Sequence, residues 1–185
     1  MSVAPSPSRA SSELANNGAG SANASARREA RRLLFDISAI DLSGRMGSRT
    51  EIERFNPHRG QMAMLDAIVW HLPNFTKGIG VKHVRDDEFW VAGHFPDRPM
   101  MPGVLMVECG AQLASYLFNI RFPETRIAAF IRLEDCTFRA SVEPGNDFYL
   151  LAKEIKFSPK RFVSDIQGLV NGKIAFEARI TGIAL

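Results

Sequence analysis

The feature that most constrains the fold of this chain is the apolar stretch of residues 102–119. Pro102 at its start is typical of the first position of a helix, and a helix of this length is about 25 Å long. The apolar side chains occupy all positions around the helix axis rather than one stripe: Val104, Leu105, Met106, Val107, Cys109, Ala111, Leu113, Ala114, Tyr116, Leu117 and Phe118. A helix that is apolar all round is buried, so the rest of the fold has to cover it.

Strand-like runs lie on both sides of this helix in the sequence. Turn residues separate them, among them Asn171-Gly172, a pair that strongly favours a two-residue β-hairpin turn. Because no repeated β-α-β pattern occurs, we expect an α+β fold in which one antiparallel sheet curls around the long helix. The predicted strands are residues 75–84, 88–92, 127–140 with an interruption near Glu134, 147–157, 161–170 and 173–183.

The segment before these strands is less regular. Ser48 and Glu51 have the spacing of a capping box, which predicts a short helix from Arg49 to about Phe55. Residues 62–70 are apolar apart from Asp66 and are compatible with either a strand or a second short helix.

Residues 1–33 differ in composition from the rest of the chain. The first 26 residues are nearly all Ser, Ala, Asn, Gly and Pro, which favours a disordered extension followed by a single domain at residues 34–185. Residues 1–32 carry the whole net charge of +3, so the domain is neutral and is not predicted to bind nucleic acid. The extension is typical of a flexible bacterial tail, which we favour, or of an organelle transit peptide.

Two further classes of protein are disfavoured. The most apolar stretch contains Glu108 and Gln112 and is shorter than the ~20 residues that a membrane-spanning helix needs, so we expect no membrane span. Cys109 and Cys136 form neither a disulfide framework nor a metal-type pair. We therefore expect reduced thiols in a cytoplasmic protein.

Glu108 is the most unusual residue of the long helix. Burying an ionised carboxylate without a partner is costly, so a glutamate in such a helix is either paired or functional. Gln112 lies one helical turn further on, on the same face, and is a candidate partner. Glu108 is thus either a structural residue or a candidate general acid.

His94 and Gly103 are two further candidates. His94 lies just before the Pro-rich segment that leads into the long helix, where an imidazole could serve in acid–base chemistry. It shares no metal-ligand spacing with His58, His71 or His83, so we expect no metal site. The amide of Gly103 lies in the first helical turn, where it lacks an intrahelical partner and could stabilise an oxyanion. Alternatively, Gly103 only permits close packing.

These residues belong to one long motif. Residues 93–108 fit the pattern G-H-F-P-x-x-P-x-M-P-G-V-L-x-x-E throughout, and residues 80–92 extend the match. The motif resembles that of the 3-hydroxyacyl-[acyl-carrier-protein] dehydratases of fatty acid synthesis. That family has the hotdog fold, a long central helix wrapped by a curved antiparallel sheet. With Glu at position 108, the motif resembles that of the dehydratases that act on many chain lengths, whereas decanoyl dehydratase/isomerases have Asp there.

The resemblance covers about residues 48–182. It includes Asn56-Pro57-His58-Arg59, Asp66, Gln112, Phe138-Arg139 and Pro144-Gly145. The chain also departs from the family pattern at three places: Gly60-Gln61 stand where the family has Tyr-Pro, Asn146 interrupts its Pro-Gly-Asp, and Cys109-Gly110 replace a more alanine-like pair. The departures concern substrate preference and tunnel shape more than the reaction.

The resemblance implies a mechanism and partners. The substrate would be a 3-hydroxyacyl chain on the phosphopantetheine of acyl carrier protein, dehydrated to a trans-2-enoyl thioester without cofactor or metal. His94 of one chain and Glu108 of its partner would be the catalytic pair, so a homodimer is the minimum unit and a hexamer built as a trimer of dimers is common. Gly103 and Gln112 would form the oxyanion and substrate-binding positions. Met100, Met106 and Phe130 are expected to line the acyl tunnel.

Two other functions remain open at this point. One is a hotdog acyl thioesterase, which would hydrolyse the thioester. The other is a non-catalytic module that binds acyl carrier protein with a degenerate site. The intact motif with His94 and Glu108 favours the dehydratase over both.

Overall fold

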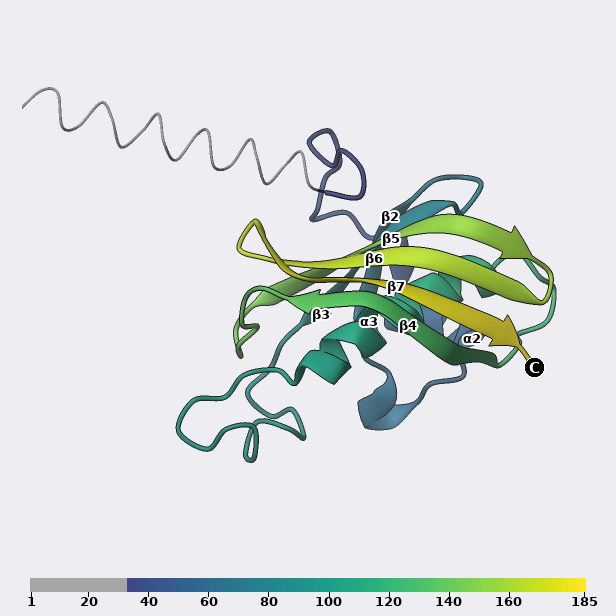
Figure 1. Cartoon of the computed structure of the whole chain (residues 1–185). Helices are drawn as coiled ribbons and strands as arrows, with labels where there is room; N and C mark the ends of the chain where they lie inside the picture. Colours follow the sequence, from purple (N-terminus) through teal and green to yellow (C-terminus); the bar gives the residue numbers. More distant parts are fainter. Residues whose placement is uncertain (1–32) are drawn as a thin grey trace, which may run out of the picture. The chain divides into compact units, whose positions relative to one another are not determined.

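The computed structural model describes residues 33–185, and its central element is helix α3 (Gly103–Asn119). Residues Leu34–Leu185 form one unit. Figure 1 shows α3 beneath the long strands β5, β6, β7 and β4. The prediction of disorder at residues 1–33 falls almost entirely outside the described residues and stays a prediction.

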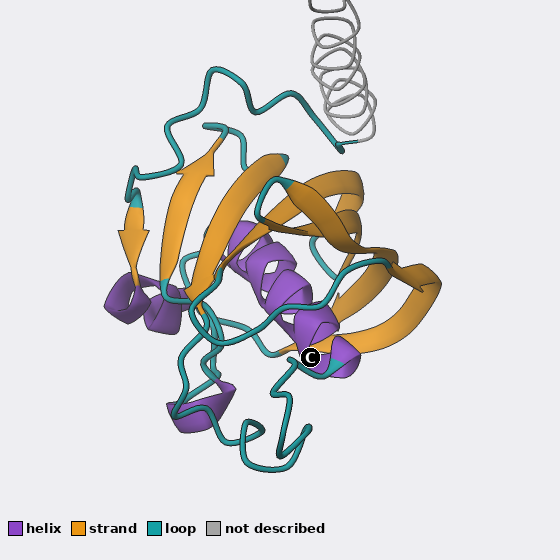
Figure 2. Ribbon diagram, turned by 90° about the vertical axis from the view of Figure 1, so that its left-hand side faces the viewer, coloured by secondary structure: helices purple, strands orange, loops and turns teal. Residues whose placement is uncertain are grey.

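Seven strands form one antiparallel sheet around this helix. Its order is β1-β2-β3-β5-β6-β7-β4, so β1 and β4 are the two edge strands. Figure 2 shows the strands curving around α3. The strands are β1 (Gly47–Ser48), β2 (Ala67–His71), β3 (Lys77–His83), β4 (Ala128–Phe138), β5 (Asp147–Ser158), β6 (Arg161–Val170) and β7 (Lys173–Ala184).

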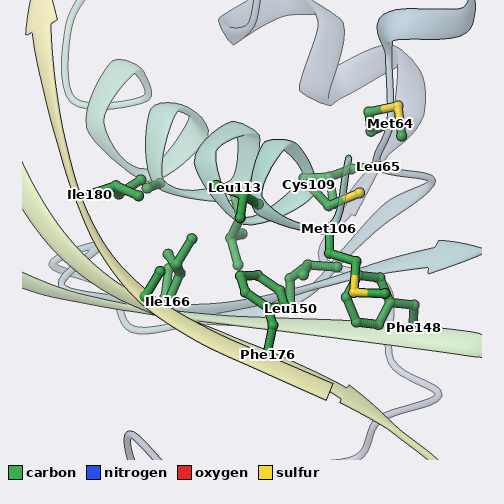
Figure 3. Packing of buried hydrophobic residues seen from close by; sticks show 14 of the residues in the cluster. Met64, Leu65, Met106, Cys109, Leu113, Phe148, Leu150, Ile166, Phe176 and Ile180 are labelled. Atoms are coloured by element: carbon green, nitrogen blue, oxygen red, sulfur yellow. The ribbon is translucent and has the colours of Figure 1, made fainter. Parts of the chain in front are cut away.

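The core lies between α3 and the concave face of the sheet. Leu113 on the helix and Leu150, Ile166 and Phe176 on three neighbouring strands are completely buried (Figure 3). Gly110 allows the close approach, because a Cβ at this position would lie 2.7 Å from Ile166 Cδ1. The departure from the family pattern at this position is therefore matched by the packing opposite it.

Several local predictions are confirmed. Asn171 and Gly172 both have positive φ in the β6–β7 hairpin turn, as a two-residue turn of this type requires. Helix α2 (Arg49–Phe55) carries the predicted capping box, with Glu51 N donating to Ser48 Oγ and the Glu51 carboxylate accepting from Ser48 N. The pairing register of β4 with β7 shifts between Glu134 and Thr137, where an interruption was expected.

Other predictions need correction. Residues 88–92 do not form a strand: Val91 N donates to Glu88 O and His94 N to Trp90 O, which makes consecutive turns. Residues 62–70 are only partly a strand, since a 3-10 helix (Gly60–Met62) precedes β2. Helix α3 begins at Gly103, with Pro102 as its N-cap.

The first turn of α3 is also less buried than its composition predicts. Val104 is 75% exposed, whereas the helix is covered by the chain from Met106 onwards apart from Glu108 and Ala111. Among residues 33–185, no helix is long and apolar enough to cross a membrane.

Candidate active site

The loop that carries His94 is held by a buried ion pair and a buried indole. Lys82 Nζ on β3 lies 2.6 Å from Glu88 Oε1, and both side chains are buried. Trp90, two residues later, is also buried, and its carbonyl accepts a hydrogen bond of 2.8 Å from His94 N. The ion pair and the indole thus anchor the turns that lead into His94.

One of the two ring nitrogens of His94 is engaged in a hydrogen bond. His94 Nδ1 lies 2.7 Å from the carbonyl oxygen of Met100. Because a carbonyl oxygen only accepts, Nδ1 carries the hydrogen and the neutral ring has its lone pair on Nε2. This tautomer makes Nε2 the atom that can take up a proton.

His94 lines an open, mainly apolar hollow of ≈ 560 Å³ at the start of α3. The amides of Gly103 and Val104 lie in the first turn, and no acceptor within residues 33–185 is bonded to either. Such amides at a helix N-terminus are suited to bind a developing negative charge. The hollow is lined by His94, Met100, Met101, Pro102, Gly103, Val104, Met106, Phe138 and Ser141.

The structure separates the residues expected in the acyl tunnel. Met100 and Met106 line the hollow with His94. Phe130 does not; it is exposed on the edge strand β4, and Phe138 from the same strand lies in the hollow instead. The Phe138 ring explains part of the need for Gly103, because a Cβ there would lie 2.8 Å from Phe138 Cε1.

Glu108 lies in a different setting, a cluster of polar groups on the other side of the α3 N-terminal half. Gln112 Nε2 donates to Glu108 Oε1 over 2.8 Å, so the predicted partnership between the two is confirmed. Gln112 Nε2 also donates to Met62 O at 2.7 Å, and Gln112 Oε1 accepts from Met64 N at 2.9 Å. With both donors and its oxygen engaged, the buried Gln112 amide orients Glu108.

His58 is the site residue that sequence reasoning missed. Its Nε2 lies 3.4 Å from Glu108 Oε1, and its side chain is about as exposed as that of Glu108, 27% against 24%. The family-like segment Asn56-Pro57-His58-Arg59 was visible in the sequence, but the separation of His58 from Glu108 along the chain gave no sign of contact.

The two candidate catalytic residues do not share a hollow within one chain. His94 lies in the hollow at the start of α3, whereas Glu108 is held by Gln112 and His58. Two apolar side chains of this region are exposed: Val104, which lines the hollow, and Phe95, whose ring stacks on that of His94.

Other reactive groups lie outside this arrangement. Both cysteines are free; Cys109 is completely buried, and burial raises the pKa of its thiol. Residues 33–185 contain no group of three or more His, Cys, Asp or Glu side chains that could hold a metal ion.

Comparison with known proteins identifies the family. Residues 56–179 match the FabA-like domain family. The chain is 36% identical over 139 residues to the 3-hydroxyacyl-[acyl-carrier-protein] dehydratase FabZ of Rickettsia africae, a match that covers 72% of this chain and 93% of the relative. The chain belongs to the 3-hydroxyacyl-[acyl-carrier-protein] dehydratase family. FabZ of Protochlamydia amoebophila is similarly related, at 36% identity over 126 residues, 67% of this chain and 80% of the relative.

Solved structures support the fold. The dehydratase heterocomplex ApeI:P from Xenorhabdus doucetiae is similar with a TM-score of 0.64 and 13% identity, covering 72% of this chain and 90% of that chain. The virulence protein Cj0977 from Campylobacter jejuni is similar with a TM-score of 0.56 and 16% identity, covering 74% and 89%. At sequence identities this low, the similarity to these two structures shows the fold alone. The resemblance seen in the sequence is thus confirmed, and with it the prediction of a hotdog-fold dehydratase.

Proposed function

We propose that this chain dehydrates 3-hydroxyacyl thioesters on acyl carrier protein to trans-2-enoyl thioesters, with His94 as base and Glu108 as acid. The supporting observation is the tautomer of His94, whose Nδ1–H is committed to Met100 O while Nε2 remains free to accept a proton in the hollow. Family membership supports the reaction, and the settings of His94 and Glu108 support the proposed roles.

The reaction is difficult for two reasons. The proton α to a thioester carbonyl is weakly acidic, and hydroxide is a poor leaving group. In the proposed step, His94 Nε2 takes the α proton, the C–O bond to the 3-hydroxyl breaks, and the Glu108 carboxyl gives its proton to the departing oxygen, which leaves as water. A positioned acid or base contributes about 10²–10⁴-fold to the rate.

The thioester oxygen gains negative charge as the α proton leaves. The free Gly103 amide at the start of α3 is suited to stabilise it, and one such donor is worth about 10²–10³-fold. Met100 and Met106 would border the acyl chain near the reacting atoms. The phosphopantetheine arm of acyl carrier protein would bring the substrate, and no cofactor or metal enters the proposed chemistry.

The proposed active unit is a homodimer in which His94 of one chain works with Glu108 of the partner subunit. Two observations support this: the two residues lie in separate surroundings within one chain, and the free edge strand β4 exposes apolar side chains. A monomer that exposes a long apolar edge strand is prone to pair with another chain. The exposed apolar residues of β4 are Phe130, Ile131, Leu133 and Phe138.

The decisive assay offers 3-hydroxyacyl-carrier substrates of several lengths and measures both enoyl product and free thiol. The proposal expects enoyl product, no free thiol, and loss of turnover in His94→Ala. Release of free thiol would favour a thioesterase, and carrier binding without either product would favour a non-catalytic module. In the same assay, a chain lacking residues 1–33 tests the proposed boundary of the catalytic domain and should keep its turnover.

A further inference from the structure

The two oxygens of the Glu108 carboxyl have different surroundings. Oε1 lies 2.8 Å from Gln112 Nε2 and 3.4 Å from His58 Nε2. Oε2 has no hydrogen-bond or ion-pair partner within residues 33–185. The carboxyl is therefore held from one side, and its two oxygens are not chemically equivalent.

The orientation of the Gln112 amide determines that Glu108 Oε1 accepts a hydrogen bond. Its amide orientation is set by the backbone, since Gln112 Nε2 donates to Met62 O and Gln112 Oε1 accepts from Met64 N. A flipped amide would put an oxygen against the Met62 carbonyl and an N–H against the Met64 amide, losing both bonds. Nε2 thus donates to Glu108 Oε1, which makes Oε1 an accepting oxygen.

The environment of His58 selects one tautomer. His58 Nδ1 is buried without a hydrogen-bond partner among residues 33–185. A hydrogen on Nδ1 would be a buried donor with no acceptor, which is costly. The neutral ring with its hydrogen on Nε2 avoids this and places an N–H 3.4 Å from Glu108 Oε1, an electrostatic contact longer than an ordinary hydrogen bond.

Neighbouring charged groups do not offer His58 another partner. Arg49 lies near it but pairs with Asp66, with Arg49 NH2 2.5 Å from Asp66 Oδ1. Arg59 donates to the backbone carbonyls of Glu53, Asn56 and His58 itself. Glu108 is the only carboxylate within ion-pair distance of the His58 ring among the described residues.

We propose that His58 is a positioning residue that, together with Gln112, keeps Glu108 Oε1 as the accepting oxygen and so places the transferable proton on Oε2. The inference rests on the proposed role of Glu108 as general acid. It assigns His58 no contact with substrate. Without the second donor, the carboxyl rotates more freely and its proton divides between the two oxygens.

The test compares two substitutions that differ in one donor. Gln can place its Nε2 where the imidazole Nε2 lies, whereas the shorter Asn cannot reach it. His58→Asn should lower kcat about tenfold with KM almost unchanged, as loss of the polar contact that orients the acid predicts, and His58→Gln should recover most of kcat. His83→Asn is the matched control, because His83 is an exposed histidine that pairs with Asp147.

The outcomes separate this proposal from the function on which it rests. Equal kcat for wild type and His58→Asn, an effect confined to KM, or equal loss in the Asn and Gln variants would overturn the role of His58. Thermal melting of each variant identifies losses caused by unfolding, and the Asn and Gln variants are compared at matched folded fraction. If Glu108→Gln in parallel keeps its turnover, the proposed role of Glu108 as acid is wrong. If Glu108→Gln is inactive and His58→Asn is not slowed, only the proposed role of His58 is wrong.

Discussion

The hollow around His94 and the cluster around Glu108 lie close in sequence but differ in construction. The hollow is open and mainly apolar, and a single hydrogen bond to Met100 O fixes its imidazole. The cluster is polar, and it joins α3 to the segment after α2 through hydrogen bonds of Gln112 with Met62 and Met64. Under the proposed roles, this difference leaves the base accessible to substrate and holds the acid in one orientation.

Each region also lacks what the other has. The hollow has space for an acyl chain and free amides but no carboxyl group, and the cluster has a carboxyl group but little space. This complementarity is the reason for placing His94 and Glu108 on different chains of a dimer. Substitutions in the two regions should therefore have effects of different kinds.

The largest expected effect is that of Glu108→Gln. The amide keeps the size of the side chain but cannot deliver a proton, so turnover should fall about 10²–10⁴-fold. Circular dichroism and melting temperature should stay near those of the wild type. Turnover near the wild-type rate would remove Glu108 from the mechanism.

Gln112→Leu should affect stability as well as turnover. The substitution leaves the buried Met64 N without a partner, removes one donor from the part-buried Met62 O and releases Glu108 Oε1. One unpaired buried group costs about 1–3 kcal/mol, so the free energy of unfolding should fall by about that amount in a denaturant titration. An unchanged free energy of unfolding in Gln112→Leu would contradict the structure.

Gly103→Ala changes the space within the hollow and leaves its charges unchanged. The added methyl group would lie 2.8 Å from the Phe138 ring, so the ring must move within the hollow. The amide is retained, and we expect turnover to fall about tenfold from overpacking alone. The double variant Gly103→Ala/Phe138→Leu should regain part of the loss. If it does not, close packing is not the reason for glycine here.

The smallest effect is expected at the cysteines, which belong to neither region's chemistry. Burial raises the pKa of the Cys109 thiol strongly. Burial also raises the pKa of Cys136, but this side chain is only partly buried and keeps access to solvent. An alkylating reagent at pH 8 should therefore modify Cys136 first and Cys109 only after unfolding, with little change in turnover. Mass spectrometry of the native and the denatured protein measures this, and rapid native labelling of Cys109 would show that the core is open.

The sequence predicted the parts of the fold that local patterns determine. The all-round apolar composition of residues 102–119 gives the central helix, and Asn171-Gly172 gives the last hairpin, because both depend on neighbours in the chain. Residues 88–92 were predicted as a strand following the charged turn at residues 85–87, but they form turns. Glu88 instead turns inward to pair with Lys82 on the preceding strand, a side-chain contact that residue propensities do not reveal.

The candidate site was predictable to a similar degree. His94, Glu108 and Gly103 lie within one contiguous motif, and Gln112 follows from helical spacing. His58 did not follow, because its contact with Glu108 joins segments that local periodicity cannot relate. Phe130 was expected in the acyl tunnel; it does not line the hollow around His94, whereas Phe138 of the same strand does.

The most direct test of the account combines two inactive chains. A His94→Ala chain and a Glu108→Gln chain, each with a different tag, are co-expressed and the mixed dimer is purified through both tags. If each site takes His94 from one chain and Glu108 from the partner subunit, one of the two sites is intact and the mixed dimer should have about half the wild-type turnover. A mixed dimer as inactive as its two parents would show that both residues act within one chain, and would contradict the account.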